Sequence, residues 1–114
     1  MKAETSYARS MYILTVTYPK SADASFDFDY FCSKHLPEMG KAFKPFGLGY
    51  ASVLRGEQAL DGGEPAYFAI TILSFATEQG ARDAVASDAG RALAGDIANF
   101  TSVAPVMQFN TPMS

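Results

Sequence analysis

The segment FDFDYFCSKHLP, residues 26–37, contains the side chains of this chain that are best suited to chemistry. His35 is the only histidine in the 114 residues. An imidazole with an ordinary pKa of about 6.5 can accept or release a proton at neutral pH, which suits it to general acid–base catalysis. The competing interpretation is a core histidine that a hydrogen bond satisfies and that takes part in no reaction. The residue type alone leaves both interpretations open.

A helix from about Phe28 to Phe43 is expected to position this histidine. Asp27 stands where an N-cap residue is preferred, and KPFGLG, residues 44–49, ends the pattern because proline and glycine do not continue a helix. At about 100° per residue, one helix face gathers the apolar side chains together with the histidine. That face consists of Phe28, Phe31, Cys32, His35, Met39 and Ala42. We therefore expect the imidazole to face the sheet.

Pro37 is expected to disturb the helix beside His35. Proline lacks a backbone N–H, so the carbonyl of Ser33 loses its helical donor, and the ring pushes the helix into a kink. Such a kink is predicted to open a pocket between helix and sheet. Phe31 and Met39 are expected to pack in the core. If the pocket binds a ligand, they would form part of its apolar wall.

Polar residues elsewhere are weaker candidates. Asp96 and Asn99 lie in the loop before the last strand, where polar groups cap backbone or contact ligands. Capping is the preferred interpretation, with Asn99 retained as a candidate ligand contact. Tyr30 projects away from the helix face that holds His35, so we assign it to packing or to an interface.

Several tyrosines lie on or beside predicted strands, and one or two of their hydroxyls could reach the pocket. Strand register decides which of them do so, because a shift of one residue moves a side chain to the other face. Tyr12 is the candidate that we retain for ligand binding. The others are Tyr18, Tyr50 and Tyr67.

Neither a metal nor a cofactor is expected. Cys32 and His35 are three residues apart and fall short of the three or four ligands of a usual metal site. Cys32 lies on or near the apolar face, where a buried thiol stays protonated and inert. Haem ligation by His35 has no second supporting motif, and no phosphate-binding loop is present.

Composition narrows the class of protein. A chain of 114 residues fits one domain, which we assign to residues 10–114, after a flexible polar leader over residues 1–9. The net charge of −3 and the pI near 4.9 argue against nucleic acid or an anionic membrane as a partner. One cysteine excludes an intrachain disulfide, and the apolar run over residues 11–18 is too short to cross a bilayer. We expect a cytoplasmic globular protein.

The periodicity predicts a β-α-β-β-α-β order. Strands are expected at residues 11–19, 50–56, 66–75 and 101–109, with a turn at Asp61-Gly62-Gly63. A second helix is capped by Thr77 and is expected to break near Ser87, and Pro105 predicts an edge or a bulge in the last strand. This order predicts an α+β, ferredoxin-like fold, in which helices cover one face of an antiparallel four-stranded sheet.

The strand compositions predict a homodimer. MYILTVTY and YFAITIL are apolar at nearly every residue, as in strands that are buried on both faces. Two helices cover only one face of a four-stranded sheet, so the other face requires a partner. A second copy packed sheet against sheet provides one.

The motif resembles that of a known family. Phe26-Asp27, Tyr30-Phe31 and His35-Leu36-Pro37, after a strand that ends in TYP, are similar to the EthD family, as is DIANFT at residues 96–101. That family belongs to the dimeric α/β-barrel superfamily, with muconolactone isomerase-like proteins and small cofactor-free monooxygenases. The resemblance covers about residues 11–109. The resemblance implies a dimeric α/β barrel. It also favours a reactive His35 more than the residue type alone does.

The expected function is therefore that of a small homodimeric protein that acts on a hydrophobic small molecule between sheet and helices. Cofactor-free oxidation, isomerisation or proton transfer in a catabolic pathway, with His35 as acid or base, is the first hypothesis. A non-catalytic accessory or binding protein for a hydrophobic metabolite is the second. A purely structural dimer with a filled core is the third, and it predicts no cavity. The expected ligand contacts are Phe31, Met39, Tyr12 and Asn99.

Overall fold

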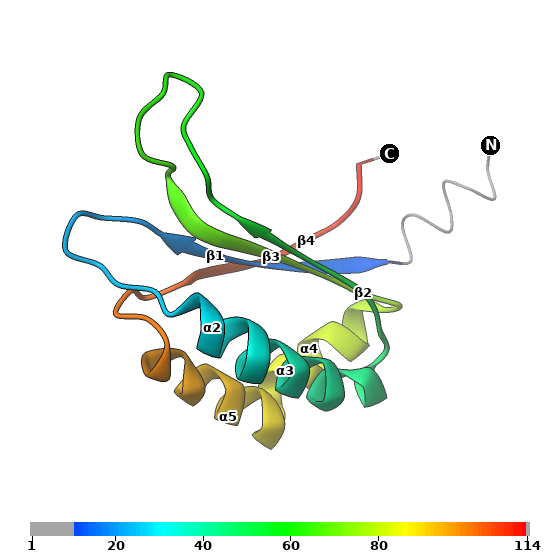
Figure 1. Cartoon of the computed structure of the whole chain (residues 1–114). Coiled ribbons are helices and arrows are strands. Elements are labelled where there is room, and N and C mark those ends of the chain that lie inside the picture. The colour runs from blue at the N-terminus through cyan, green and yellow to red at the C-terminus, as the bar shows by residue number, and fades with distance from the viewer. Residues whose placement is uncertain (1–10, 114) are drawn as a thin grey trace.

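The computed structural model describes residues 11–113, so the predicted leader over residues 1–9 lies outside the described residues. The strands are β1 (Tyr12–Pro19), β2 (Leu48–Arg55), β3 (Tyr67–Phe75) and β4 (Val106–Asn110). They form one antiparallel sheet in the order β2-β3-β1-β4, with the helices on one face (Figure 1). The predicted α+β, ferredoxin-like architecture is confirmed. Within residues 11–113, no helix is long and apolar enough to span a membrane.

The core lies between the sheet and the helices. Along β1, inward-facing side chains are buried and their neighbours are half-buried, which is the alternation expected when one face of a strand is covered. On the central strand β3, Leu73 and Phe75 are fully buried. The inward-facing residues of these two strands are Leu14, Val16, Tyr18, Ala69, Thr71, Leu73 and Phe75.

The first helical stretch has the predicted bounds and an unpredicted centre. It consists of α2 (Phe28–Tyr30), a π-helical turn η1 (Phe31–His35) and α3 (Leu36–Phe43), with Asp27 as the N-cap. In the π turn, the Leu36 N–H donates to the Phe31 carbonyl five residues back. The disturbance expected near Pro37 thus takes the form of a widened turn directly before the proline.

The widened turn changes which residues face the sheet. The buried residues of the stretch now recur at intervals of four: Phe31, His35, Met39 and Phe43. The prediction that Cys32 lies on or near the buried face is wrong, because this spacing leaves its side chain exposed. The uniform advance of about 100° per residue, which placed Cys32 inward, does not hold through a π turn.

The second helical stretch breaks where the sequence predicts. Helix α4 (Glu78–Ala86) is capped by Thr77, and α5 (Asp88–Asp96) begins after Ser87. The Ser87 hydroxyl accepts from the Gly90 N–H at 3.0 Å and donates to the Ala84 carbonyl at 2.6 Å. This pair of contacts turns the chain between the two helices.

Gly90→Ala is expected to destabilise the fold by about 1–3 kcal/mol, since a Cβ at this position would lie 2.2 Å from the Ala84 carbonyl oxygen. Gly95 in the same helix is a matched control, because a Cβ there meets nothing within 4 Å. Gly95→Ala should stabilise the helix by about 0.5–1 kcal/mol. Urea unfolding of both variants measures these changes. Equal effects of the two substitutions would contradict the close packing of α4 against α5.

Two strand boundaries differ from the predictions. Strand β2 begins at Leu48 and not at residue 50, since a short 3₁₀ turn η2 (Lys44–Phe46) and Gly47, at φ 93°, already redirect the chain into the sheet. Strand β4 begins at Val106 and not at residue 101, because Pro105 has no N–H to donate to the sheet. Thr101 forms only an isolated bridge with Phe26. The edge position predicted for the last strand is confirmed.

The connection between β2 and β3 is a long hairpin that rises away from the helices (Figure 1). Its predicted turn is present: Gly62 has φ 92°, and the Gly63 N–H donates to the Asp61 carboxylate at 2.9 Å. The hairpin therefore extends on the side of the sheet that no helix covers.

Candidate functional site

A cavity of about 120 Å³ lies between the sheet and the helices. Its walls are almost entirely apolar and come from β1, β3, β4 and the helices packed over them. Exposed side chains of Val85, Arg91 and Met107 also line it, which places its opening between α4, α5 and the edge strand β4. An apolar protein cavity of roughly 150 Å³ can hold benzene, so this space suits a ligand of about one six-membered ring. The described residues therefore leave an apolar space beside His35, in place of the filled core of the third hypothesis.

His35 forms part of the cavity wall and is only 4% exposed. Its Nδ1 lies 2.9 Å from Oδ2 of Asp96, and its ring packs against Phe31 and Phe100 at centroid distances of 5.9 Å and 4.7 Å. A carboxylate only accepts hydrogen bonds, so we assign the ring proton to Nδ1. In the neutral ring, Nε2 then carries a lone pair. Within residues 11–113, no group donates a hydrogen bond to it.

Asp96, at the end of α5, is held as a carboxylate by three donors. The Tyr30 hydroxyl donates to Oδ1 at 2.6 Å, the Asn99 amide donates to Oδ1 at 2.9 Å, and His35 donates to Oδ2. These hydrogen bonds, with that from Tyr30 the largest cause, lower the pKa of Asp96 to about 2. The same contact raises the pKa of Tyr30. Asp96 is thus ionised at neutral pH and fixes the orientation of the imidazole.

Three of the five predicted site residues line the cavity: Phe31, His35 and Met39. Tyr12 and Asn99 are not part of its wall. Asn99 contributes indirectly, through its hydrogen bond to Asp96. The strand tyrosine that does line the cavity is Tyr18, which is 2% exposed and whose pKa is raised by burial.

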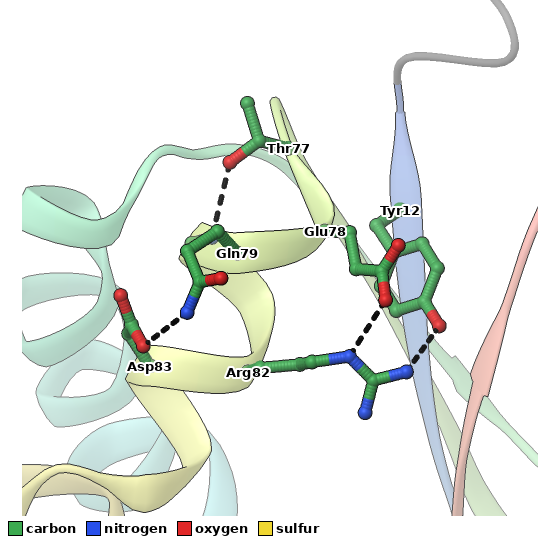
Figure 2. A network of polar contacts seen from close by, with 7 residues as sticks. Tyr12, Thr77, Glu78, Gln79, Arg82 and Asp83 are labelled. Carbon is green, nitrogen blue, oxygen red and sulfur yellow. Dashed lines mark hydrogen bonds and ion pairs between the residues drawn. The ribbon is translucent and has the colours of Figure 1, made fainter.

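Tyr12 has a different role at the other end of β1. Its hydroxyl accepts from Nη2 of Arg82 at 2.8 Å, and Nε of Arg82 donates to Glu78 at 2.8 Å (Figure 2). The Arg82 guanidinium also lies over the rings of Tyr12 and Phe109, at 5.4 Å and 4.9 Å from their centroids. This cluster connects α4 to the sheet and lies apart from the cavity wall.

Sequence reasoning missed the partners of His35. Asp96 was assigned to capping and Tyr30 to packing or an interface, yet both belong to one hydrogen-bond network with the imidazole. Five residues of an α-helix separate two side chains by about 140° of rotation, whereas a π turn reduces that angle. Tyr30 and His35 can therefore reach the same carboxylate. The DIANFT segment was the available signal for Asp96.

No family model matches this chain. An uncharacterised 11.0 kDa protein from the thcB–thcC intergenic region of Rhodococcus erythropolis is 35% identical over 102 residues, which cover 87% of this chain and 92% of the relative.

Solved structures give the same fold. An EthD-like protein from Ralstonia eutropha is 28% identical, with a TM-score of 0.83 over 93% of this chain and 95% of its own. An EthD family protein from Bacillus halodurans is 21% identical, with a TM-score of 0.73 over 90% and 99%. SnoaB, a cofactor-independent oxygenase from Streptomyces nogalater, shares the fold at 13% identity and a TM-score of 0.63, over 93% and 95%. The chain therefore has the ferredoxin-like α+β fold of these proteins and is similar to the EthD-like proteins among them.

Proposed function

We propose that this protein binds a small, largely apolar, ring-sized compound in the cavity and transfers a proton to or from it, with His35 as the acid or base. The observation that carries the proposal is the contact of Nδ1 with Asp96, which leaves Nε2 as the basic atom of a residue in the cavity wall. The competing role is a core histidine that its hydrogen bond to Asp96 satisfies, and it predicts that no ligand reaches Nε2.

The chemistry follows from this arrangement. Nε2 accepts the proton of an O–H, or of an acidic C–H, and the ligand becomes a phenolate or an enolate. The imidazolium that forms is stabilised by the adjacent Asp96 carboxylate, and the apolar walls strengthen that attraction by excluding water. Return of the proton to a different atom gives isomerisation.

Oxygenation is the other outcome of the same step. An electron-rich phenolate or enolate can transfer one electron to molecular oxygen, and the superoxide and organic radical that result combine to form a C–O bond. Where that carbon carries a hydrogen, loss of water from the hydroperoxide leaves a carbonyl, so that one oxygen atom enters the product and the other leaves as water. SnoaB is a cofactor-independent oxygenase with the same fold, which supports this route as one use of the architecture. In both routes, the contribution of the chain is the same: it binds the ring, removes one proton and keeps water away from the anion.

The test is incubation of the protein with single-ring phenols, quinols and lactones, followed by mass spectrometry of the recovered compounds. A changed compound supports catalysis. A compound that is bound and recovered unchanged supports the accessory or binding role. If no compound binds, the cavity is not a ligand site and the proposal fails.

We also propose that two copies pair through the uncovered face of the sheet. Register and exposure support this pairing, since the apolar side chains on that face include Tyr50, Leu54 and Val106, which are 58%, 49% and 54% exposed. Ile13, Ile70 and Ile72, on the two central strands, complete the apolar surface. Exposed apolar surface of this extent favours association.

Sedimentation at micromolar concentration should therefore give twice the 12.2 kDa chain mass. Ile72→Lys should give the single-chain mass with an unchanged circular dichroism spectrum, because it places a charge at the centre of the paired sheets. A wild-type protein that sediments as a single chain would contradict the pairing.

A further inference from the structure

Thr71 presents a buried hydroxyl that lacks a hydrogen-bond partner. The residue is 2% exposed, lines the cavity, and its Oγ1 has no partner within the described residues. A buried polar atom is normally satisfied, and leaving one unsatisfied lowers stability. Valine has nearly the same shape and would fill this position without that loss. The hydroxyl therefore requires an explanation beyond packing.

The first helical stretch and β1 run in opposite directions across the cavity. At one end, the rings of Phe31 and Tyr18 pack 5.7 Å apart. At the other end, Phe43 packs against Phe75 at 5.8 Å, and Phe75 pairs with Tyr12 of β1. Positions along the helix can therefore be matched to positions along the strand.

This matching places His35 and Thr71 on opposite walls at the same level. From Phe31 to His35 the chain makes about one helical turn and advances roughly 5 Å, and from Tyr18 to Val16 a strand advances about 6.6 Å. His35 is thus level with Val16, whose partner on β3 is Thr71. The helix layer supplies His35 and the sheet layer supplies Thr71, with apolar side chains between them. The other polar side chains of the wall are Tyr18, which packs at the Phe31 end, and Arg91, which is exposed.

We propose that Thr71 is the second polar contact of the ligand, and that the ligand is a single-ring phenol with another oxygen on the far side of the ring, as in hydroquinone. One hydroxyl donates to Nε2 of His35, and the opposite oxygen exchanges a hydrogen bond with the Thr71 hydroxyl, which can donate or accept. The ring fills the apolar space between them. This inference rests on the proposed function, because it assumes that the cavity under His35 is the ligand site.

The ligand class follows from which compounds would leave His35 or Thr71 without a hydrogen-bond partner. A toluene-like ring would leave both polar groups unpaired, and phenol would leave Thr71 unpaired. A site with a buried hydrogen-bonding group discriminates strongly against an analogue that lacks the matching atom. Two oxygens at opposite ends of one ring satisfy both walls at once.

The experiment measures the affinities of hydroquinone (kept under argon), phenol and toluene for the wild type, Thr71→Val and Thr71→Ser, from the shifts of the His35 ring resonances. The wild type should bind hydroquinone roughly tenfold more tightly than phenol, which corresponds to one satisfied hydrogen bond. Thr71→Val should remove this preference and leave phenol binding unchanged. Thr71→Ser, which keeps the hydroxyl, should retain the preference.

A second measurement guards against a folding defect. The thermal midpoint of ligand-free Thr71→Val should equal or exceed that of the wild type, since the substitution removes an unsatisfied polar atom. A preference for hydroquinone that survives in Thr71→Val, or that is absent from the wild type while phenol still shifts His35, overturns the role of Thr71 alone. If none of the three compounds shifts His35, the proposed function fails and this inference fails with it.

Discussion

His35→Gln is expected to lower turnover of the bound compound by about 10²–10⁴-fold. Glutamine is polar, fits a similar space and can still donate a hydrogen bond to Asp96, so the cavity and the network should persist. It has no basic nitrogen, however, and cannot take up a proton. The measurement is the rate of product formation by mass spectrometry at equal protein concentration.

A control separates chemistry from binding in this experiment. The affinity of His35→Gln for toluene, which offers no polar group to His35, should stay within a few-fold of the wild-type value because the apolar walls are unchanged. If His35→Gln retains full turnover, His35 is not the acid or base, and another group must move the proton.

Asp96→Asn is expected to lower turnover by about 10–100-fold, the range that is typical for loss of a partner that orients a reactive group. An asparagine can present its amide N–H₂ to Nδ1. The ring would then carry its proton on Nε2 and lose the basic atom that is assigned to the cavity. The readout specific to this role is the tautomer of His35, determined from its ¹⁵N chemical shifts.

Asp88→Asn is the matched control for this substitution. Asp88 lies in the same helix and pairs with Arg91 at 2.6 Å, but its side chain is almost fully exposed. An exposed ion pair of this kind contributes little. Turnover and the His35 tautomer should both remain unchanged in Asp88→Asn. An equal loss in the two variants would mean that charge on α5, and not the contact with His35, is what matters.

The low pKa of Asp96 also predicts the acid limit of the network. The pKa in the folded protein is about 2, below its ordinary value, so ionised Asp96 favours the folded state. That contribution is fully present above the pKa of the unfolded chain and is lost as the pH falls through about 2. Asp96→Asn should therefore flatten the acid side of the stability profile in this window.

The fold was predictable because its signals are local and periodic. The alternation along β1, the Thr77 cap and the break at Ser87 each depend on neighbouring residues, and each was found as predicted. The boundary errors have equally local causes. A glycine with positive φ lets β2 begin at Leu48, and the missing N–H of Pro105 delays β4.

The candidate site was predictable only in part, because its centre depends on a departure from regular geometry. His35, Phe31 and Met39 were found because they lie four residues apart on one buried face. Tyr30 was placed correctly, away from the buried face and beside Lys34 and Glu38, but its hydrogen bond to Asp96 was not predicted. Asp96 and Thr71 lie far from His35 in sequence, and no local pattern joins side chains that only the packed layers bring to one cavity.

The most direct test of the central claim is ¹⁵N NMR of the His35 ring in the protein without any purification tag. A single histidine gives a single set of ring signals. We predict a ring with a proton on Nδ1 and an Nε2 resonance that shifts when phenol is added. A ring protonated at Nε2, or a resonance that no compound shifts, would contradict the assignment of His35 as the acid or base of a ligand cavity.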